Sequence, residues 1–591
     1  SKTASTAIGG NSGNGLSIYN TGSVSITGVN AWSNGGHGLY ISNRLWPYGK
    51  PVALTRVESI FNTAGHGIYV YTAGSVSMQD IFTVENDAHG LWIDACVTDG
   101  FGGCLNIANV TLKGSNNAFS NNDGAGLDIS TKGSVNLSHL DVYGNDAGGV
   151  KIFNALNGTS PVTIGGKVSS KIDTNTGYGL WVESHGAITV KNLIVQNTTD
   201  FVFGPNGAMY LFNRGPAKKG VTVADVEIYN NEQTGLFINT DGLVSLLGVT
   251  SNYNSITSNW IPVSGSVNGV RERLSGYWEN EDRWHFNGVS GESYTITLTS
   301  SAFRPMLVLE DSLGNQLDMD PDADEDDSAV IFFSPILDEE YILRVQASDW
   351  GMGVYELTFG GDIYDALNNN PFSGATIYTP MSVKVSSSKA IFSSFNGNNG
   401  DGLYINVDSS GTGSVSLVNV GADNNNYNGV SIEAPNGNVS LSNNHARLSG
   451  FSWNGFQGVK IISGGTITLN NRLMAMGNGQ EGFYLDNHSA LAPKTVTIKN
   501  VQTWFNVSSG LTANSLGNIS VTNLDASANN RNGASLSTLG NVTLLGSNVF
   551  SGNIEDGLGV AASGVISING VLAEGNHING LDIQSNGAGK T

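Results

Sequence analysis

Positive charge is scarce in this sequence. Its 591 residues include 27 lysines and arginines against 49 aspartates and glutamates, which gives a formal net charge of -22. A protein that binds nucleic acid or an anionic membrane needs a basic patch, and so few cations over this length do not provide one. The composition therefore argues against nucleic acid as a partner.

Long apolar stretches are missing as well. No run of about 18 apolar residues occurs, so we expect no segment that inserts into a membrane. Residues 1–10 lack the charged start and the apolar core of a secretion signal. We expect that any export signal has been removed or lies outside this sequence.

Only two cysteines occur, Cys96 and Cys104, and both lie in one glycine-rich stretch. This spacing fits a short local disulfide, for which the two Cα atoms must approach within about 7 Å. A disulfide indicates an oxidising compartment, and therefore an exported protein that is extracellular or at the cell surface. The alternative is a pair of free thiols in a cytosolic protein.

Charged residues make up only 13% of the chain, whereas glycine occurs 78 times. Residues that favour helices are sparse, and asparagine, serine, threonine and valine are abundant. Short strands joined by tight turns require such a composition. We therefore expect an all-β protein built by repetition.

One phrase recurs along the chain: Asn-x-x-x-Gly-aliphatic-x-aliphatic, followed after a few turn residues by a second alternating segment. Its 17 copies place the glycine at positions 15, 38, 67, 90, 126, 149, 179, 207, 235, 402, 429, 458, 482, 510, 533, 557 and 580. The spacings cluster at 23 or 24 residues, with longer intervals where loops are added. The alternation, as in Gly15–Ile18 and Ser23–Ile26, predicts two short strands per coil with every second side chain inward.

Parallel stacking of such coils repeats each position about 4.8 Å along the axis. We expect Leu16, Leu39, Ile68 and Leu91 to form an aliphatic stack inside. The asparagines should form a ladder whose amides donate and accept along the same axis. An asparagine stands four residues before the glycine in 15 copies, at Asn11, Asn34, Asn86, Asn122, Asn145, Asn175, Asn231, Asn398, Asn425, Asn454, Asn478, Asn506, Asn529, Asn553 and Asn576, but not in the copies at Gly67 and Gly207.

On this phrase the chain resembles the right-handed parallel β-helix superfamily, which includes pectate lyases, tailspikes and large secreted adhesins. The likeness covers residues 1 to about 254 and about 375 to 591. It implies a β-helix fold. It specifies the activity poorly, because one fold carries many functions.

The phrase disappears between about Ile256 and Gly361, where aromatic and charged residues become more frequent. Alternating segments such as Gly291–Leu298 and Glu340–Val345, with turns between them, favour a β-sandwich. Their order is similar to that of the bacterial pre-peptidase C-terminal domain, which implies an accessory or surface-binding module. We predict a first β-helix array of about nine coils at 1–254, a sandwich at 255–362, and a second array of about eight coils at 363–591.

An acidic run inside this segment offers oxygen ligands at every second residue, at Asp318, Asp320, Asp322, Asp324 and Asp326. Such oxygens suit a Ca²⁺ ion, the one cofactor that the sequence suggests. The run lacks the glycine and the distal glutamate of an EF-hand loop. A solvated acidic loop is the alternative.

Two fragments suggest polysaccharide hydrolysis, namely Asn239-Thr-Asp-Gly242 and the Gly-His-Gly sequences at 36–38 and 65–67. In the pectin-hydrolysing branch of the superfamily these elements occur in the opposite order, with paired aspartates and an Arg-Ile-Lys sequence that this chain lacks. Hydrolysis requires two facing carboxylates, and a lyase requires acidic Ca²⁺ ligands beside an arginine or lysine base. We find neither arrangement and expect no catalytic residues; a polysaccharide lyase or glycoside hydrolase is the alternative.

His37, His66 and His89 each precede the glycine of the phrase in consecutive coils, so they should stack at one turn. We interpret them as a polar ladder. The alternative is a metal site, but coil geometry rather than tetrahedral coordination would set their spacing.

The residue two positions after the glycine should point outward. It is aromatic in three successive coils and again further along, at Tyr40, Tyr69, Trp92, Trp181 and Phe237. Exposed aromatic rows are typical of recognition surfaces, because flat rings stack on sugar faces or on another protein. The alternative is that long loops cover these rings.

Together these features favour a structural component of a bacterial surface fibre, sheath or adhesin. Both ends of the sequence still carry the repeat phrase, so we expect copies to join head to tail through uncapped coil ends. The alternative is a secreted β-helix protein that binds or cleaves a surface polysaccharide.

Overall fold

The chain divides into two compact units, Ser1–Ser255 with Phe372–Thr591, and Ile256–Pro371. The computed structural model describes residues 6–43, 49–97, 104–154, 159–199, 208–232, 234–252, 254, 259–260, 265–271, 282–288, 294–300, 304–311, 315–320, 328–335, 339–347, 353–360, 373–387, 393–445 and 449–585. Every regular element among these residues is a strand. No helix long and apolar enough to span a membrane occurs in the described part of the chain.

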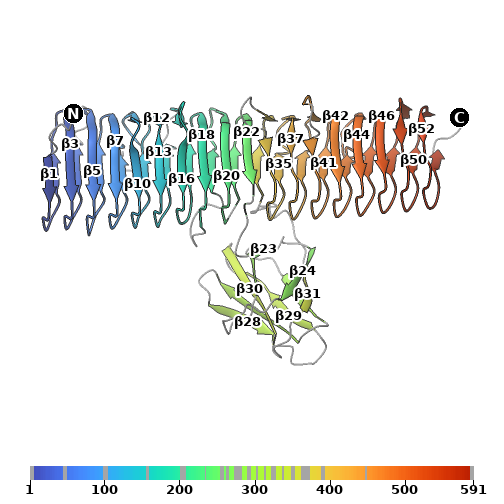
Figure 1. The fold of residues 1–591 in the computed structure, drawn as a ribbon, viewed down its shortest axis with the longest axis horizontal. Coiled ribbons are helices and arrows are strands. Elements are labelled where there is room, and N and C mark those ends of the chain that lie inside the picture. Colours follow the sequence, from blue (N-terminus) through green and yellow to red (C-terminus); the bar gives the residue numbers. More distant parts are fainter. Residues whose placement is uncertain are drawn as a thin grey trace. The chain divides into compact units, whose positions relative to one another are not determined.

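The first unit is a parallel β-solenoid in which each coil contributes strands to two long sheets (Figure 1). Sheet 1 has 26 strands. They are β1 (Thr6–Gly9), β3 (Val24–Trp32), β5 (Val52–Ile60), β7 (Val76–Val84), β9 (Val110–Lys113), β10 (Asn117–Ser120), β12 (Val135–Leu137), β13 (Leu140–Tyr143), β15 (Val162–Ile164), β16 (Ser170–Asp173), β18 (Ile188–Gln196), β20 (Val221–Tyr229), β22 (Val244–Asn252), β33 (Val383–Ser386), β34 (Ser393–Ser394), β36 (Val415–Val418), β37 (Val420–Gly421), β39 (Val439–Ser442), β40 (Ser449–Gly450), β42 (Ile467–Met476), β44 (Val496–Trp504), β46 (Ile519–Ser527), β48 (Val542–Leu545), β49 (Asn548–Val549), β51 (Ile566–Ile568) and β52 (Val571–Leu572).

Sheet 2 takes one short strand from each coil, directly after the glycine of the repeat phrase or, in one coil, after Ala208. Its strands are β2 (Leu16–Tyr19), β4 (Leu39–Asn43), β6 (Ile68–Thr72), β8 (Leu91–Asp94), β11 (Leu127–Ser130), β14 (Val150–Asn154), β17 (Leu180–Ser184), β19 (Met209–Asn213), β21 (Leu236–Thr240), β32 (Ala375–Thr379), β35 (Leu403–Val407), β38 (Val430–Ala434), β41 (Val459–Ser463), β43 (Phe483–Asp486), β45 (Leu511–Ser515), β47 (Ala534–Thr538), β50 (Leu558–Ala562) and β53 (Leu581–Ser585).

The predicted aliphatic stack lies inside the solenoid. Leu16 pairs in register with Leu39, Leu39 with Ile68, and Ile68 with Leu91. The last three side chains are fully buried, and Leu16 packs against the same apolar cluster. Alternate residues of each strand therefore fill one continuous core, as the period-2 pattern predicts.

The longest strands of sheet 1 bend at a residue in the left-handed conformation. Asp80, Asn192 and Asn523 occupy this position in β7, β18 and β46, with φ between 48° and 54°. Asparagine and aspartate tolerate positive φ better than other side chains. The abundance of asparagine thus reflects the corners of the coil as well as the ladder.

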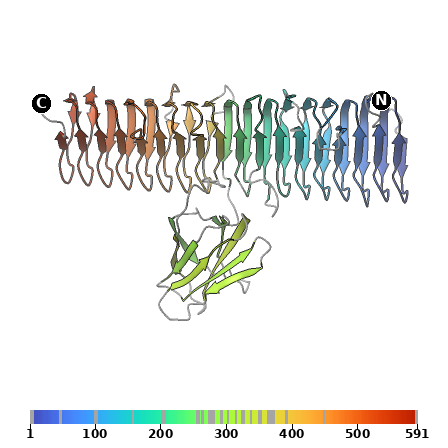
Figure 2. The same ribbon diagram turned by 180° about the vertical axis from the view of Figure 1, so that it is seen from behind.

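The solenoid is continuous across the second unit, which corrects the predicted division into two arrays. Strand β21 pairs with β32, and β22 pairs with β33 and β34, all in parallel (Figures 1 and 2). The sequence analysis missed one copy of the repeat phrase, whose glycine is Gly374. Its ladder asparagine is Asn254, on the other side of the inserted segment, so the insertion occupies a single turn of one coil.

The second unit contains two small sheets. One consists of β23 (Asn259–Trp260), β25 (Asp282–Gly288), β30 (Glu339–Ala347), β27 (Pro305–Asp311) and β28 (Gln316–Asp320), and the other of β24 (Gly265–Arg271), β31 (Gly353–Gly360), β26 (Tyr294–Thr299) and β29 (Ser328–Phe333). All their pairings are antiparallel except β23 with β25. Ile296 and Ile331 of one sheet share an apolar cluster with Leu309 and Leu343 of the other.

Candidate functional site

The asparagine ladder predicted from the sequence is confirmed. Asn122, for example, accepts a hydrogen bond at Oδ1 from Nδ2 of Asn86 and donates from its own Nδ2 to Oδ1 of Asn145, both at 2.8 Å. The backbone N–H of Asn86 donates to the same Oδ1 at 3.2 Å. Because these amides are fully buried, each coil satisfies polar groups of its neighbour that would otherwise lack partners.

The ladder has two members that sequence reasoning missed and one substitution. Asn62 bridges Asn34 and Asn86 at 2.9 and 2.7 Å, although it stands five residues before its glycine rather than four. Asn254 is the second. In the coil of Gly207 the position belongs to Thr198, whose backbone N–H donates to Oδ1 of Asn231 at 2.9 Å. Allowing a one-residue insertion in the phrase would have found Asn62.

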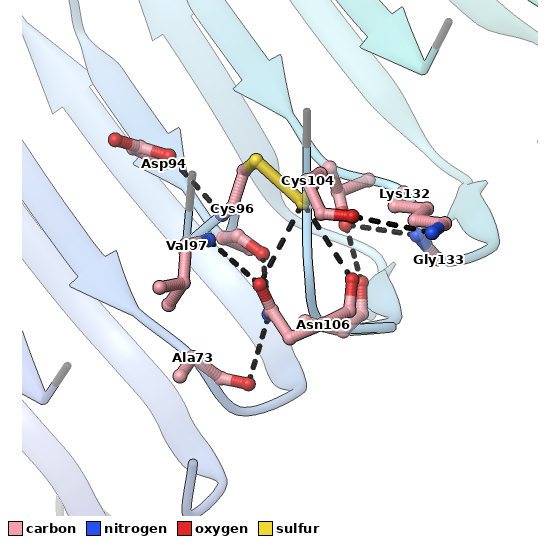
Figure 3. The surroundings of a disulfide bond; sticks show 11 residues. Ala73, Asp94, Cys96, Val97, Cys104, Asn106, Lys132 and Gly133 are labelled. Carbon is pink, nitrogen blue, oxygen red and sulfur yellow. Dashed lines mark hydrogen bonds between the residues drawn. A yellow bond between two sulfur atoms is a disulfide. The ribbon is translucent and has the colours of Figure 1, made fainter. Parts of the chain in front are cut away.

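Cys96 and Cys104 form a disulfide with their Cα atoms 5.3 Å apart (Figure 3). Asn106, which the sequence analysis did not single out, holds the segment against the solenoid. Its Nδ2 donates to the carbonyls of Ala73 and Ala95, at 3.0 and 2.9 Å, and its Oδ1 accepts from the Val97 N–H at 2.7 Å. The disulfide is consistent with an exported protein.

The proposed calcium ligands are only partly visible. Asp318 and Asp320 lie on β28, and Asp322, Asp324 and Asp326 fall outside the described residues. The carboxylate of Asp320 accepts a hydrogen bond from the Val330 N–H at 2.6 Å. The described part of the chain contains no group of three or more histidine, cysteine or acidic side chains that could hold a metal ion. Calcium binding stays a prediction.

His37, His66 and His89 stack in line along one turn. Neighbouring rings are 5.1 Å apart and 8° from parallel. Nδ1 of His37 accepts the backbone N–H of His66 at 2.9 Å, and Nδ1 of His66 accepts that of His89 at 3.1 Å. Nδ1 of His89 accepts the N–H of Ala125 at 2.8 Å. The three imidazoles thus form a second ladder beside the asparagines.

Other coils use asparagine or aspartate at the histidine position with the same geometry. Oδ1 of Asn14 accepts the N–H of His37 at 2.8 Å, Oδ1 of Asp401 accepts that of Asn428 at 2.7 Å, and Oδ1 of Asn532 accepts that of Asp556 at 2.9 Å. The position therefore requires an acceptor for the next coil rather than histidine as such.

The outward aromatic residues form a row across sheet 2. Tyr40 pairs in register with Tyr69, and Tyr69 with Trp92. Their ring centroids are 5.4 and 5.0 Å apart. All three side chains are partly exposed, between inward neighbours that are fully buried. Within the described residues, the chain's own loops do not bury them.

The row continues beyond Trp92 through two charged residues. Asp128 pairs with Trp92, Lys151 with Asp128, and Trp181 with Lys151. Lys151 Nζ lies 4.6 Å from the centre of the Trp181 ring, and Trp181 Nε1 donates to Glu183 at 2.9 Å. Burial raises the pKa of Asp128, although Lys151 and His89 act in the opposite direction.

Two further rings extend the row past Trp181. Tyr210 pairs with Trp181 and stacks on Phe237 with centroids 4.9 Å apart and planes 3° from parallel. The sequence analysis missed Tyr210 because it took Gly207 as the glycine of this coil, and Tyr210 stands three residues after it. In the register of β17 and β19 the glycine position belongs to Ala208, since Met209 pairs with Leu180. We call the outward residues Tyr40, Tyr69, Trp92, Asp128, Lys151, Trp181, Tyr210 and Phe237 the aromatic face.

The histidine stack borders the first part of the aromatic face. The ring of His37 lies 5.6 Å from that of Tyr40, and the ring of His66 lies 4.6 Å from that of Trp92 in an edge-on arrangement. Imidazole, phenol and indole rings thus contact one another over three coils, with His37 and His89 partly exposed and His66 9% exposed between them. Such a surface offers flat apolar rings together with N–H and O–H groups at their edges.

The fragment Asn239–Gly242, which suggested hydrolysis, comprises the last two residues of β21 and the start of the turn that follows. Asn239 Oδ1 accepts a hydrogen bond from Arg214 Nε at 2.7 Å, and the N–H of Gly242 donates to Thr240 Oγ1 at 3.0 Å. These residues are engaged in the scaffold. Among the described residues, no contact of this turn brings two carboxylates to face each other.

Comparisons with known proteins give little beyond this. No family model and no curated protein matches the chain. Among solved structures, the pre-peptidase C-terminal domain of the collagenase from Bacillus anthracis matches 17% of this chain and 94% of its own, at 20% identity and a TM-score of 0.15. The enzymatically active domain of tailspike protein 4 from bacteriophage CBA120 matches 57% of this chain and 55% of its own, at 9% identity and a TM-score of 0.17.

Proposed function

We propose that this protein is an exported, surface-associated solenoid whose aromatic face binds an extended polysaccharide. The observation that carries this proposal is the unbroken register of Tyr40, Tyr69 and Trp92 on consecutive coils, with centroids 5.4 and 5.0 Å apart. Aromatic rings in such a row stack on the apolar faces of sugar rings. The repeat of the rings follows the coil, so a polymer lying along the solenoid axis meets an equivalent platform at each step.

The ordering of these side chains supports binding rather than chance exposure. A large side chain left mobile at a surface loses conformational freedom when a ligand immobilises it. Here the rings contact one another and the histidine stack, so much of that ordering precedes the ligand. Of the structural roles that the sequence suggests, an adhesin fits this surface better than a passive fibre or sheath component.

Several finer assignments accompany this proposal. We assign the solenoid to the right-handed, pectate-lyase-like superfamily on its repeat phrase. We assign the second unit to a β-sandwich of the pre-peptidase C-terminal type, because two small sheets share one apolar cluster. Head-to-tail assembly, a calcium site and the absence of catalysis remain separate proposals that do not affect the aromatic face.

Replacing Trp92 with alanine tests the proposal. We would screen the full chain by affinity electrophoresis in gels that contain neutral polysaccharides (mixed-linkage β-glucan, xyloglucan, galactomannan) or anionic ones (polygalacturonate, alginate, hyaluronate). The proposal predicts retardation by at least one of these polymers and its loss in Trp92→Ala. Trp32→Ala is the matched control, since Trp32 is exposed on sheet 1 away from the aromatic face. Equal retardation of both variants, or none for the parent chain, would contradict the proposal.

A further inference from the structure

The scaffold fixes the tautomer of the histidine stack. Nδ1 of His37, His66 and His89 accepts a backbone N–H from the following coil in each case. An imidazole nitrogen that accepts a hydrogen bond carries no proton, so the neutral ring must hold its proton on Nε2. The rings are neutral near pH 7, because burial and the neighbouring histidines lower the pKa of His66 to about 3 and burial lowers the pKa of His37 and His89.

The three Nε2–H groups have no hydrogen-bond partner among the described residues, although every Nδ1 has one. Because the rings are 5.1 Å apart and nearly parallel, the donors repeat at the spacing of the coils. The rings also contact the aromatic face directly, His37 against Tyr40 and Tyr69, and His66 against Trp92. A row of like donors therefore runs beside a row of stacking platforms.

We propose that the Nε2–H groups of His37, His66 and His89 donate hydrogen bonds to ring or hydroxyl oxygens of successive sugars in an uncharged polysaccharide. This inference rests on the proposed function and names its ligand class and its polar contacts. Stacking on Tyr40, Tyr69 and Trp92 holds the sugar faces, and the imidazole donors select sugars whose oxygens recur along the chain at the same spacing. Neutral donors suit neutral oxygens, whereas a carboxylated sugar would meet no positive charge on the three imidazoles, and Lys151 of the aromatic face lies beside Asp128.

The charges around the histidine stack also favour an uncharged polysaccharide. Asp128 and Lys151, the two charged residues of the aromatic face, act in opposite directions on the pKa of His89, Asp128 raising it and Lys151 lowering it. Asp94 stands two residues after Trp92 on β8, and the whole chain is acidic, with a net charge of -22. An anionic polymer would therefore be repelled along most of the surface.

A metal ion is a poorer occupant of the stack. Zinc requires its nitrogen ligands at about 2.0–2.1 Å around one centre. Parallel rings 5.1 Å apart present their Nε2 atoms side by side and do not converge on such a point. The geometry suits a repeating ligand rather than a single ion.

The triple variant His37→Asn, His66→Asn, His89→Asn separates the donor from the scaffold role. Asparagine fits this position, since Oδ1 of Asn14 accepts the N–H of His37 in the same way. The variant should retain the ladder and the fold, as judged by circular dichroism, but lose the three Nε2–H donors at the outer edges of the rings, because the Nδ2–H groups of asparagine lie closer to the backbone. We expect it to bind the retarding neutral polysaccharide about tenfold more weakly than the parent chain, the effect of a few neutral hydrogen bonds.

Four outcomes distinguish the claims. Weaker binding by the folded triple variant, together with loss in Trp92→Ala, supports the inference. Binding within about twofold of the parent overturns the donor role while leaving the proposed function standing. Retardation only by anionic polymers overturns the ligand class, and no retardation by any polymer overturns both proposals. If the triple variant unfolds, the single variant His37→Asn, next to Asn14, carries the same test with a smaller expected loss.

Discussion

The side-chain amide of Asn254 donates to Oδ1 of Asn398 at 3.1 Å, although 144 residues separate the two asparagines. The backbone N–H of Asn254 reaches the same oxygen at 3.1 Å. The ladder thus continues across the inserted unit as it does between any two coils. Asn254 and Asn398 therefore make the same ladder bonds as asparagines of neighbouring coils elsewhere in the solenoid.

Deleting residues 256–371 should leave the solenoid folded. The deletion joins Asn254-Ser255 to Phe372-Ser373-Gly374 and restores the usual spacing of the repeat phrase. Because every parallel pairing around the insertion lies outside it, we expect the strand signal in circular dichroism and the thermal midpoint to change little. Loss of cooperative unfolding in the shortened chain would show that the second unit is required for the fold.

Replacing Asn122 with alanine should weaken the solenoid. The change leaves the backbone N–H of Asn86 without its acceptor, removes the ladder acceptor of Asn86 Nδ2, and removes one of the two donors to Oδ1 of Asn145, all in fully buried residues. Buried polar groups that lose their partners cost about 1–3 kcal/mol. We expect a lower urea midpoint for Asn122→Ala, and little change for Asn444→Ala, whose side chain is exposed. Equal midpoints would mean that the ladder contributes no stability.

The histidine stack should make stability depend on pH. In the folded chain the pKa of His66 is about 3, whereas its ordinary value is 6.5. The unfolded chain therefore binds more protons between these values, and this contribution to stability is complete above about pH 6.5 and is lost as pH falls toward 3. Protonation of Nδ1 would also remove its bond to the next coil.

The variant His66→Asn isolates this contribution, because it leaves every carboxylate of the chain in place. We expect the thermal midpoint to fall less between pH 7 and pH 4 in His66→Asn than in the parent chain. His577→Asn, at an exposed histidine, should behave like the parent. A parent and a His66→Asn variant with the same pH profile would exclude the buried stack as the cause.

The repeat phrase predicted much of the fold because each coil needs the same inward and ladder residues at the same positions. Inward aliphatics such as Leu39 and Ile68, and the ladder asparagines, repeat with the coil and can be read from the spacing alone. The sequence analysis missed the copy formed by Asn254 and Gly374 because an insertion of more than a hundred residues separates them. Sequence spacing cannot show that two distant residues belong to one coil. That continuity appears only in the pairing of β21 with β32.

The candidate site was predicted in part. Tyr40, Tyr69 and Trp92 follow the phrase, and their row could be foreseen from it. Tyr210 could not, because the phrase places the glycine of this coil at Gly207, whereas Ala208 occupies that position in the register of β17 and β19. The role of the imidazole nitrogens was also beyond the sequence, since it depends on which ring atom accepts the backbone N–H of the next coil.

Chemical footprinting would test the central claim most directly. We would label the aromatic side chains of the full chain with hydroxyl radicals, with and without the polysaccharide that retards it, and quantify each site by mass spectrometry. Polysaccharide binding on the aromatic face predicts protection of Tyr40, Tyr69 and Trp92. It predicts no protection of Trp453 and Phe505, which are 58% and 59% exposed elsewhere on the solenoid. Unchanged labelling of Tyr40, Tyr69 and Trp92 in the bound state would contradict the account.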